Sequence, residues 1–145
     1  MLKVFLAGPI HGFEDRQEYR DRIKAVLRRF GYEVVDPWER ERKVYQKSAG
    51  DRDWWKKAKP EDFVRRDLED IRRCDVFVAY LPTLSAGTCM ELFYAKLCGK
   101  RTIVVCEIPD PSPWIVVHSD MLLRSIEELE AFLRQRPAAG AGGGI

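Results

Sequence analysis

Cysteine and histidine are scarce in this sequence, and no hydrophobic run is long. Only four cysteines and two histidines occur among 145 residues, and no two cysteines have the C-x-x-C spacing of metal and redox sites. We therefore expect reduced structural cysteines and no metal site. No run approaches the roughly 20 apolar residues of a membrane-spanning helix, and the segment MLKVFLAGPI is too short for a secretory signal. We expect a cytoplasmic protein without a membrane partner.

The chain also lacks an excess of charge of either sign. Its 25 basic and 23 acidic residues leave a formal net charge of +2, which gives no global reason to expect nucleic acid as a partner. Small molecules are the favoured ligands. The apolar share of 46% suffices for one hydrophobic core, and we expect a single domain over residues 1–134. The remaining segment, 135–145, ends in the low-complexity run PAAGAGGGI and is predicted to be a disordered tail.

Short apolar runs alternate with segments of helical periodicity, which is typical of a parallel α/β sheet. The predicted strands are 2–7, 32–36, 75–81, 101–108 and 115–123, and the predicted helices are 15–30, 60–73, 88–98 and 125–134. Together they predict a doubly wound open sheet of five strands. Residues 39–59 are charged and aromatic without a clear period, so we expect a surface excursion long enough to be a functional flap. Trp54 and Trp55 in this excursion either stack on a nucleobase or anchor the segment to the body.

Three loops are candidates for a ligand site, because ligands of open α/β sheets bind beyond the carboxyl ends of the strands. They are AGPIHGFED after the first strand, DPWERER after the second, which begins with Asp36, and LPTLSAGT after the third. Gly8, Gly12 and Gly87 allow a ligand to approach the backbone closely, and the helix N-termini behind the loops favour an anionic group. None of the loops carries a known nucleotide-binding fingerprint. His11 is either a ligand contact or incidental.

Asp67 falls on or beside the stripe of helix 60–73 that Val64, Leu68 and Ile71 are predicted to bury. A buried carboxylate is costly without a purpose. Two interpretations are open: Asp67 caps a loop or pairs with an arginine, or it acts as an acid/base or hydroxyl acceptor in the cleft at the strand ends.

Glu91 also has two interpretations. Thr88 and Glu91 have the S/T-x-x-E spacing of a helix capping box, as do Ser125 and Glu128 at a surface helix. Glu91, however, follows a small-residue loop that leaves a buried strand, so it is either a cap or a nucleophile at the mouth of a pocket. Two further expectations concern helix surfaces: Met90, Phe93, Tyr94 and Leu97 pack their helix, and DRIKAVLRR is a solvated face.

Three segments, VFLAGPI, RRDLEDIRRCDVFVAYL and LSAGTCMELFYAKLCGK, resemble the nucleoside 2-deoxyribosyltransferase family and the related 2'-deoxynucleoside 5'-monophosphate N-glycosidases. The resemblance implies a flavodoxin-like domain that cleaves an N-glycosidic bond through a covalent deoxyribosyl-glutamate, without a cofactor. It places the nucleophile at Glu91 and the residue that holds the sugar and assists proton transfer at Asp67. It also implies a homodimer or larger homo-oligomer with shared sites. The substrate contacts that we expect are Gly8, Pro9, Ile10, His11, Gly12, Asp36, Ser85 and Gly87, with Trp114, His118 and Ser119 contributed across the subunit interface.

The sequence departs from the family pattern at two positions near the expected 5' side of the substrate. Ser85 stands where many transferases carry an aspartate, and a neutral hydroxyl accepts a phosphate that an aspartate would repel. His11 stands where the nucleotide hydrolases carry arginine. We rank transfer of the sugar to another nucleobase first and hydrolysis of deoxynucleoside monophosphates second. A non-catalytic nucleotide-binding module and, more remotely, a flavodoxin-like electron carrier are the alternatives from other classes.

Overall fold

The computed structural model describes residues 1–135, so the predicted disordered tail lies outside the described residues except for Gln135. Five parallel strands form one sheet in the order β2-β1-β3-β4-β5. The strands are β1 (Lys3–Ala7), β2 (Glu33–Val35), β3 (Val76–Leu81), β4 (Arg101–Cys106) and β5 (Met121–Leu123). The helices are α1 (Glu18–Arg29), α2 (Trp38–Lys47), α3 (Trp54–Lys57), α4 (Pro60–Arg73), α5 (Ala86–Leu97), α6 (Pro113–His118) and α7 (Ile126–Arg134). The prediction of a single doubly wound, flavodoxin-like domain is confirmed.

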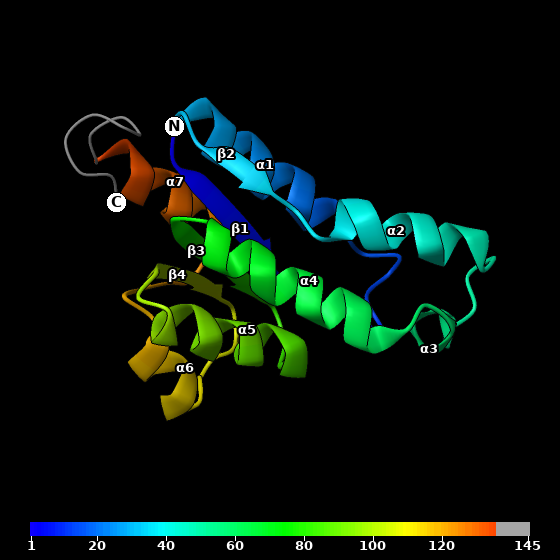
Figure 1. Ribbon diagram of the computed structural model, residues 1–145. Helices are drawn as coiled ribbons and strands as arrows, with labels where there is room; N and C mark the ends of the chain where they lie inside the picture. The colour runs from blue at the N-terminus through cyan, green and yellow to red at the C-terminus, as the bar shows by residue number, and fades with distance from the viewer. Residues whose placement is uncertain (136–145) are drawn as a thin grey trace.

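Two hydrophobic cores lie on opposite faces of the sheet, because successive side chains of a strand point to opposite sides. Val4 and Leu6 of β1 pack with α1 and α7, whereas Phe5 and Ala7 pack with α4, α5 and α6. In Figure 1, α4 and α5 lie side by side over one face of the sheet. The face that α4, α5 and α6 cover carries the site described below, which lies at the carboxyl ends of the strands.

Helix boundaries follow local sequence signals where such signals are present. Gly31 and Gly99, both with positive φ, end α1 and α5, as glycine does after a helix. The hydroxyl of Ser125 accepts a hydrogen bond from the backbone N–H of Glu128 at 3.1 Å, which confirms the cap predicted for α7.

Two segments differ from the prediction. The excursion 39–59 is largely helical, since α2 begins directly after Pro37 and α3 follows it, and Figure 1 shows both helices projecting beyond the carboxyl ends of the strands. The predicted strand 115–123 is divided: α6 occupies its first part and only Met121–Leu123 forms β5. The reason is local, because Ser112 caps α6 by accepting a hydrogen bond from the Trp114 N–H and Pro113 fits the first helical turn.

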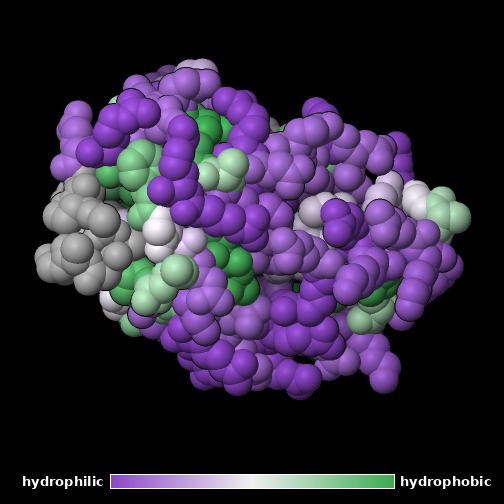
Figure 2. All heavy atoms as spheres, turned by 90° about the horizontal axis from the view of Figure 1, so that it is seen from above, coloured by the Kyte–Doolittle hydropathy of each residue, from purple (hydrophilic) through white to green (hydrophobic). Residues whose placement is uncertain are grey.

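Hydrophilic residues dominate the face of the molecule that α1 and α2 form, which Figure 2 shows from above. Exposed apolar side chains gather elsewhere, mainly on α5 and α6. None of the helices within residues 1–135 has the length and hydrophobicity of a membrane span.

Candidate active site

A cavity of about 940 Å³ opens at the carboxyl ends of β1 and β3, between the β1–α1 loop, α2, α4, α5 and α6. Most of its wall is apolar. Ten of the predicted site residues line it: Gly8, Pro9, Ile10, His11, Asp67, Ser85, Gly87, Glu91, Trp114 and His118. Gly12, Asp36 and Ser119 are not among the lining residues. The loops chosen from the sequence therefore do converge on one cavity, although not every residue in them faces it.

The start of α5 decides between the two interpretations of Glu91. Ser85, and not Thr88, is the N-cap: its hydroxyl accepts from the Thr88 N–H at 3.4 Å and lies 2.9 Å from the Thr88 hydroxyl. The helix thus begins three residues earlier than the capping-box spacing predicted, which leaves Glu91 in the second turn. A residue at that depth cannot satisfy the free N–H groups of the first turn. The interpretation of Glu91 as a helix cap is therefore excluded, and Glu91 is a lining residue of the cavity.

Glu91 lies among negative groups. Burial raises the pKa of its carboxyl well above the ordinary value, and the charges of Asp67 and Glu41 raise this pKa further, while Arg20 opposes them. These surroundings favour the protonated form of Glu91, against the positive end of the α5 dipole. The ionised form of Glu91 is therefore favoured when a neighbouring carboxyl group holds a proton.

Asp67 pairs with an arginine, as one of its two interpretations predicted, and it also lies in the wall of the cavity. Its carboxylate pairs with the Arg40 guanidinium at 3.0 Å, and Asp70 accepts from the same nitrogen at the same distance. Asp67 is nevertheless a lining residue of the cavity, and burial raises the pKa of its carboxyl even though Arg40 lowers it. Val64, predicted to be buried beside it, is half-exposed at the cavity wall.

Glu41 is a lining residue that the sequence analysis missed. It lies on α2, one turn after Trp38, and these are the two buried residues of that helix. Burial raises the pKa of Glu41, and the neighbouring negative charge of Asp67 adds to the effect. A signal for this position did exist in the sequence, since Trp38, Glu41 and Tyr45 are spaced as one helical face.

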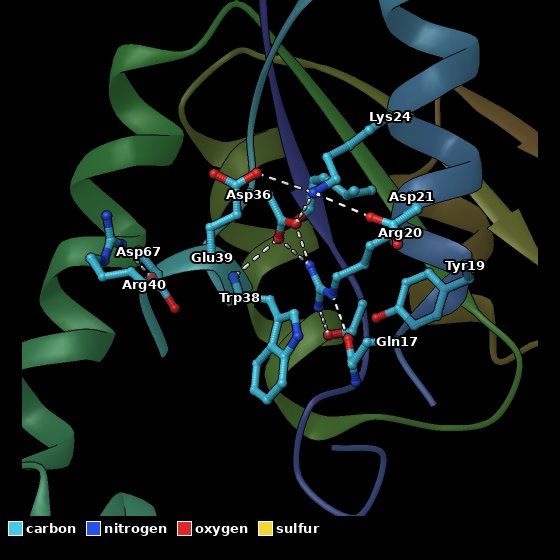
Figure 3. Close-up of polar contacts among 12 residues, drawn as sticks. Gln17, Tyr19, Arg20, Asp21, Lys24, Asp36, Trp38, Glu39, Arg40 and Asp67 are labelled. Carbon is cyan, nitrogen blue, oxygen red and sulfur yellow. Dashed lines mark hydrogen bonds and ion pairs between the residues drawn. The ribbon is translucent and has the colours of Figure 1, made fainter. Parts of the chain in front are cut away.

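Arg20 holds the end of β1 and the start of the β1–α1 loop, and Figure 3 shows its polar contacts. Its guanidinium donates to the carbonyl oxygens of Leu6 and Gly8, at 3.3 and 2.9 Å, and to the Asp36 carboxylate at 2.8 Å. Lys24 lies 3.0 Å from the other oxygen of Asp36. The prediction that DRIKAVLRR is a solvated face is thus wrong for Lys24, and Asp36 is engaged by Lys24 and by Arg20, which precedes that segment, and is not a lining residue of the cavity.

Aromatic side chains hold the excursion against the β1–α1 loop. The His11 ring lies 5.8 Å from that of Trp54 and 5.4 Å from that of Trp55, and burial lowers the pKa of the imidazole, which favours its neutral form. Trp54 is buried, and its indole N–H donates to Glu14 at 3.0 Å. Trp54 therefore anchors the excursion and is not free to stack on a nucleobase.

The far side of the cavity is formed by α5 and α6. His118 stacks on Trp114, with ring centroids 6.1 Å apart, and meets the edge of Phe93. The Ser119 hydroxyl donates to the Ile115 carbonyl. The expectation that four side chains of α5 pack that helix is wrong for Met90 and Leu97, which are largely exposed, and for Phe93, which is about half exposed. It is confirmed for Tyr94, which is partly buried against the core beside Leu92 and Ala95.

Together, the fold and the cavity define a flavodoxin-like domain with a carboxylate cluster at the carboxyl edge of its sheet. The family model "Nucleoside 2-deoxyribosyltransferase" matches residues 4–127, so the chain belongs to the nucleoside 2-deoxyribosyltransferase family. A search of curated proteins gives no match.

Two solved structures have the same fold. A 2-deoxyribosyltransferase from the psychrotolerant bacterium Bacillus psychrosaccharolyticus is similar with a TM-score of 0.66 and 21% identity, over 90% of this chain and 95% of that one. A CMP N-glycosidase of Clostridium botulinum is similar with a TM-score of 0.61 and 22% identity, over 92% of this chain and 99% of that one. At these identities the likeness concerns the fold and leaves the substrate open.

Proposed function

We propose that the protein is a nucleoside 2-deoxyribosyltransferase that cleaves the N-glycosidic bond of 2'-deoxynucleosides and passes the sugar to another nucleobase. The observation that carries this proposal is the position of Glu91 and Asp67 in one cavity, together with membership of the family. Glu91 attacks C1' as the base departs, which gives a covalent deoxyribosyl-glutamate, and an incoming base then displaces the glutamate. Asp67 binds a hydroxyl of the sugar.

The charge of the cavity supports an uncharged 5' end on the substrate. No lysine or arginine is among the lining residues of the described chain, and burial against the Trp54 and Trp55 rings lowers the pKa of His11, which favours the neutral imidazole. Three carboxyl groups line the same space. A phosphate dianion would meet repulsion there without a compensating cation from this chain. A nucleoside therefore fits the cavity better than its 5'-monophosphate.

A 2'-deoxynucleoside 5'-monophosphate N-glycosidase is the second candidate, and Ser85 is the observation that favours it. Its hydroxyl lies at the N-terminus of α5, where backbone N–H groups and the helix dipole stabilise an anion. In that case water, and not a nucleobase, would release the sugar from Glu91.

A base-exchange assay separates these activities. The protein is incubated with 2'-deoxynucleosides and with their 5'-monophosphates, with and without isotopically labelled adenine, and the products are separated by chromatography. We expect labelled 2'-deoxyadenosine from the nucleosides. Release of deoxyribose 5-phosphate from the monophosphates, without labelled product, would replace the transferase by the N-glycosidase. Nucleotide binding without base release would indicate a binding module.

We further propose that a second copy of the chain covers the apolar surface of α5 and α6. This surface includes Leu97, Trp114 and Val117, each about 70% exposed or more. Isolated exposed apolar residues are ordinary, but a cluster of this kind on adjacent helices is typical of an interface. Trp114 and His118 line the cavity of their own chain, and we propose that in such a homo-oligomer they and Ser119 also contact substrate in the neighbouring subunit.

Replacement of Leu97 by glutamate is expected to shift the protein from oligomer to monomer, because the interface would bury an unpaired charge. Light scattering after size exclusion measures the change. The matched control is Val44→Glu on α2, an exposed apolar residue outside the surface, which should keep the oligomer. A wild-type protein that is monomeric at the concentration of the activity assay would contradict the proposal.

A further inference from the structure

Glu41 is a buried acid that the proposed function does not yet use. Glu41 is only 4% exposed, and its Oε2 atom has no hydrogen-bond partner within residues 1–135. A buried polar atom without a partner is costly, and such atoms are rare outside functional sites. Glu41 is also one of the lining residues of the cavity that holds Glu91 and Asp67. Asp36 also has a buried oxygen without a hydrogen-bond partner, but of the two acids only Glu41 lines the cavity, where a ligand can reach it.

Glu41 and Asp67 are adjacent carboxyl groups with unequal partners. Asp67 pairs with Arg40 at 3.0 Å, whereas Glu41 has no ion pair in the described chain. Two charged carboxylates this close repel each other, so one proton remains between them. The arginine stabilises the ionised form of Asp67, which leaves the proton on Glu41.

The other charged groups around Glu41 act in both directions. A side-chain hydrogen bond with Asp67 raises the pKa of Glu41, while Arg20 on α1 and Arg40 on its own helix lower it, and the charge of Glu41 in turn raises the pKa of Glu91 on α5. Burial is the largest cause of the raised pKa of Glu41, and the charge of Asp67 is the next. Glu41 is consequently an acid that can still hold a proton when Glu91 is ionised.

Resting on the proposed function, we infer that Glu41 is the catalytic acid that protonates the departing nucleobase, and that Asp67 is its ionised neighbour. In the first half-reaction the C1'–N bond breaks and its electron pair goes to the base. The Glu41 carboxyl gives its proton to a ring nitrogen of that base, and a Glu91 oxygen forms the bond to C1'. In the second half-reaction the acceptor base attacks C1', the bond to Glu91 breaks, and the Glu41 carboxylate takes up the N–H proton of the acceptor.

This assignment predicts a leaving-group effect in Glu41→Gln. Glutamine has nearly the same shape as a protonated carboxyl group and still donates a hydrogen bond, but it cannot transfer a proton. With 2'-deoxyadenosine we expect a loss of about 10²- to 10⁴-fold in kcat, which is the usual contribution of a general acid. With 7-methyl-2'-deoxyguanosine, whose base leaves as a neutral molecule without a proton, we expect a loss of less than about tenfold.

The matched control is Glu39→Gln, a neighbouring acid on α2 whose side chain is half exposed and pairs with Lys24. It should leave both rates unchanged. Equal losses with both substrates in Glu41→Gln, or no loss with either, would overturn the assignment. A wild-type protein that releases base from neither substrate would instead refute the proposed function.

The pH profile gives a second test with 2'-deoxyadenosine alone. In the wild type kcat falls as the pH rises through the pKa of Glu41, because the acid loses its proton. In Glu41→Gln the residual rate should lose this basic limb. A basic limb that is unchanged in the variant would contradict the role of Glu41 as the acid.

Discussion

Glu91→Gln is expected to reduce base release from every substrate by about 10⁴-fold or more, which is the scale for loss of a catalytic nucleophile. The amide fills the same space in the cavity, but it has no negative charge with which to trap an oxocarbenium-like sugar. The measurement is the single-turnover rate of base release with 2'-deoxyadenosine. Because the nucleophile serves both half-reactions, exchange and hydrolysis should disappear together.

The same variant should be more stable than the wild type at neutral and alkaline pH. The pKa of Glu91 is raised in the fold, so the native state loses stability as the pH rises above the ordinary carboxyl pKa. Glutamine removes this loss, and we expect a gain of about 1–2 kcal/mol, or ~3–6 °C in Tm, at pH 8. Below about pH 4 the carboxyl of residue 91 is protonated in both the folded and the unfolded wild type, so the wild type and the variant should have the same free energy of unfolding. An inactive variant that is also less stable at pH 8 would indicate a structural role for Glu91.

Arg20→Met is expected to destabilise the fold by about 3–5 kcal/mol, the usual cost of removing one partner from a buried ion pair. Arg20 and Asp36 are both almost fully buried and 2.8 Å apart, and the same guanidinium holds the Leu6 and Gly8 carbonyls. Loss of these bonds should also free the loop that forms one wall of the cavity. Urea unfolding measures the free-energy change, and KM for the nucleoside reports on the loop.

The matched control is Arg22→Met on the same helix. Arg22 pairs with Glu127 at 3.1 Å, but both side chains are mostly exposed, and such pairs contribute about 0–1 kcal/mol. A large loss for Arg20 and a negligible one for Arg22 would follow from their difference in burial. Similar values for the two variants would contradict the structural role assigned to the Arg20–Asp36 pair.

Hydrophobic patterning predicted the sheet because its strands are buried on both faces and its helices have one apolar side. Gly31 and Gly99 predicted the ends of α1 and α5, because glycine readily adopts the positive φ that follows a helix. The pattern was too weak to predict α2, because the spacing of Trp38 and Tyr45 is the only apolar signal of the face that also buries Glu41. It also gave no sign that Arg20 is buried, because the burial of a cation depends on a partner, Asp36, that is distant in the sequence.

The candidate site was likewise predicted in part: its motifs were located correctly, and the local structure around them was not. The order of the motifs placed Glu91 and Asp67 correctly in a shared cavity, but the spacing at Thr88 predicted a helix start that Ser85 takes instead. Short capping patterns overlap in SAGTCME, and only the position of the preceding strand selects among them. Similarly, the exposed apolar side of α5 is indistinguishable by pattern from a core-facing side. The sequence cannot tell burial within one subunit from burial between two.

The central claim, a covalent deoxyribosyl-glutamate at residue 91, is tested most directly by trapping it. The protein is incubated with a 2'-deoxy-2'-fluoroarabinosyl nucleoside, whose fluorine at C2' destabilises the oxocarbenium-like transition state and slows release of the sugar. Peptide mass spectrometry should then find one fluorodeoxypentosyl group on the peptide that contains Glu91, and none in Glu91→Gln. Release of base without any adduct, or an adduct on a different residue, would contradict the claim.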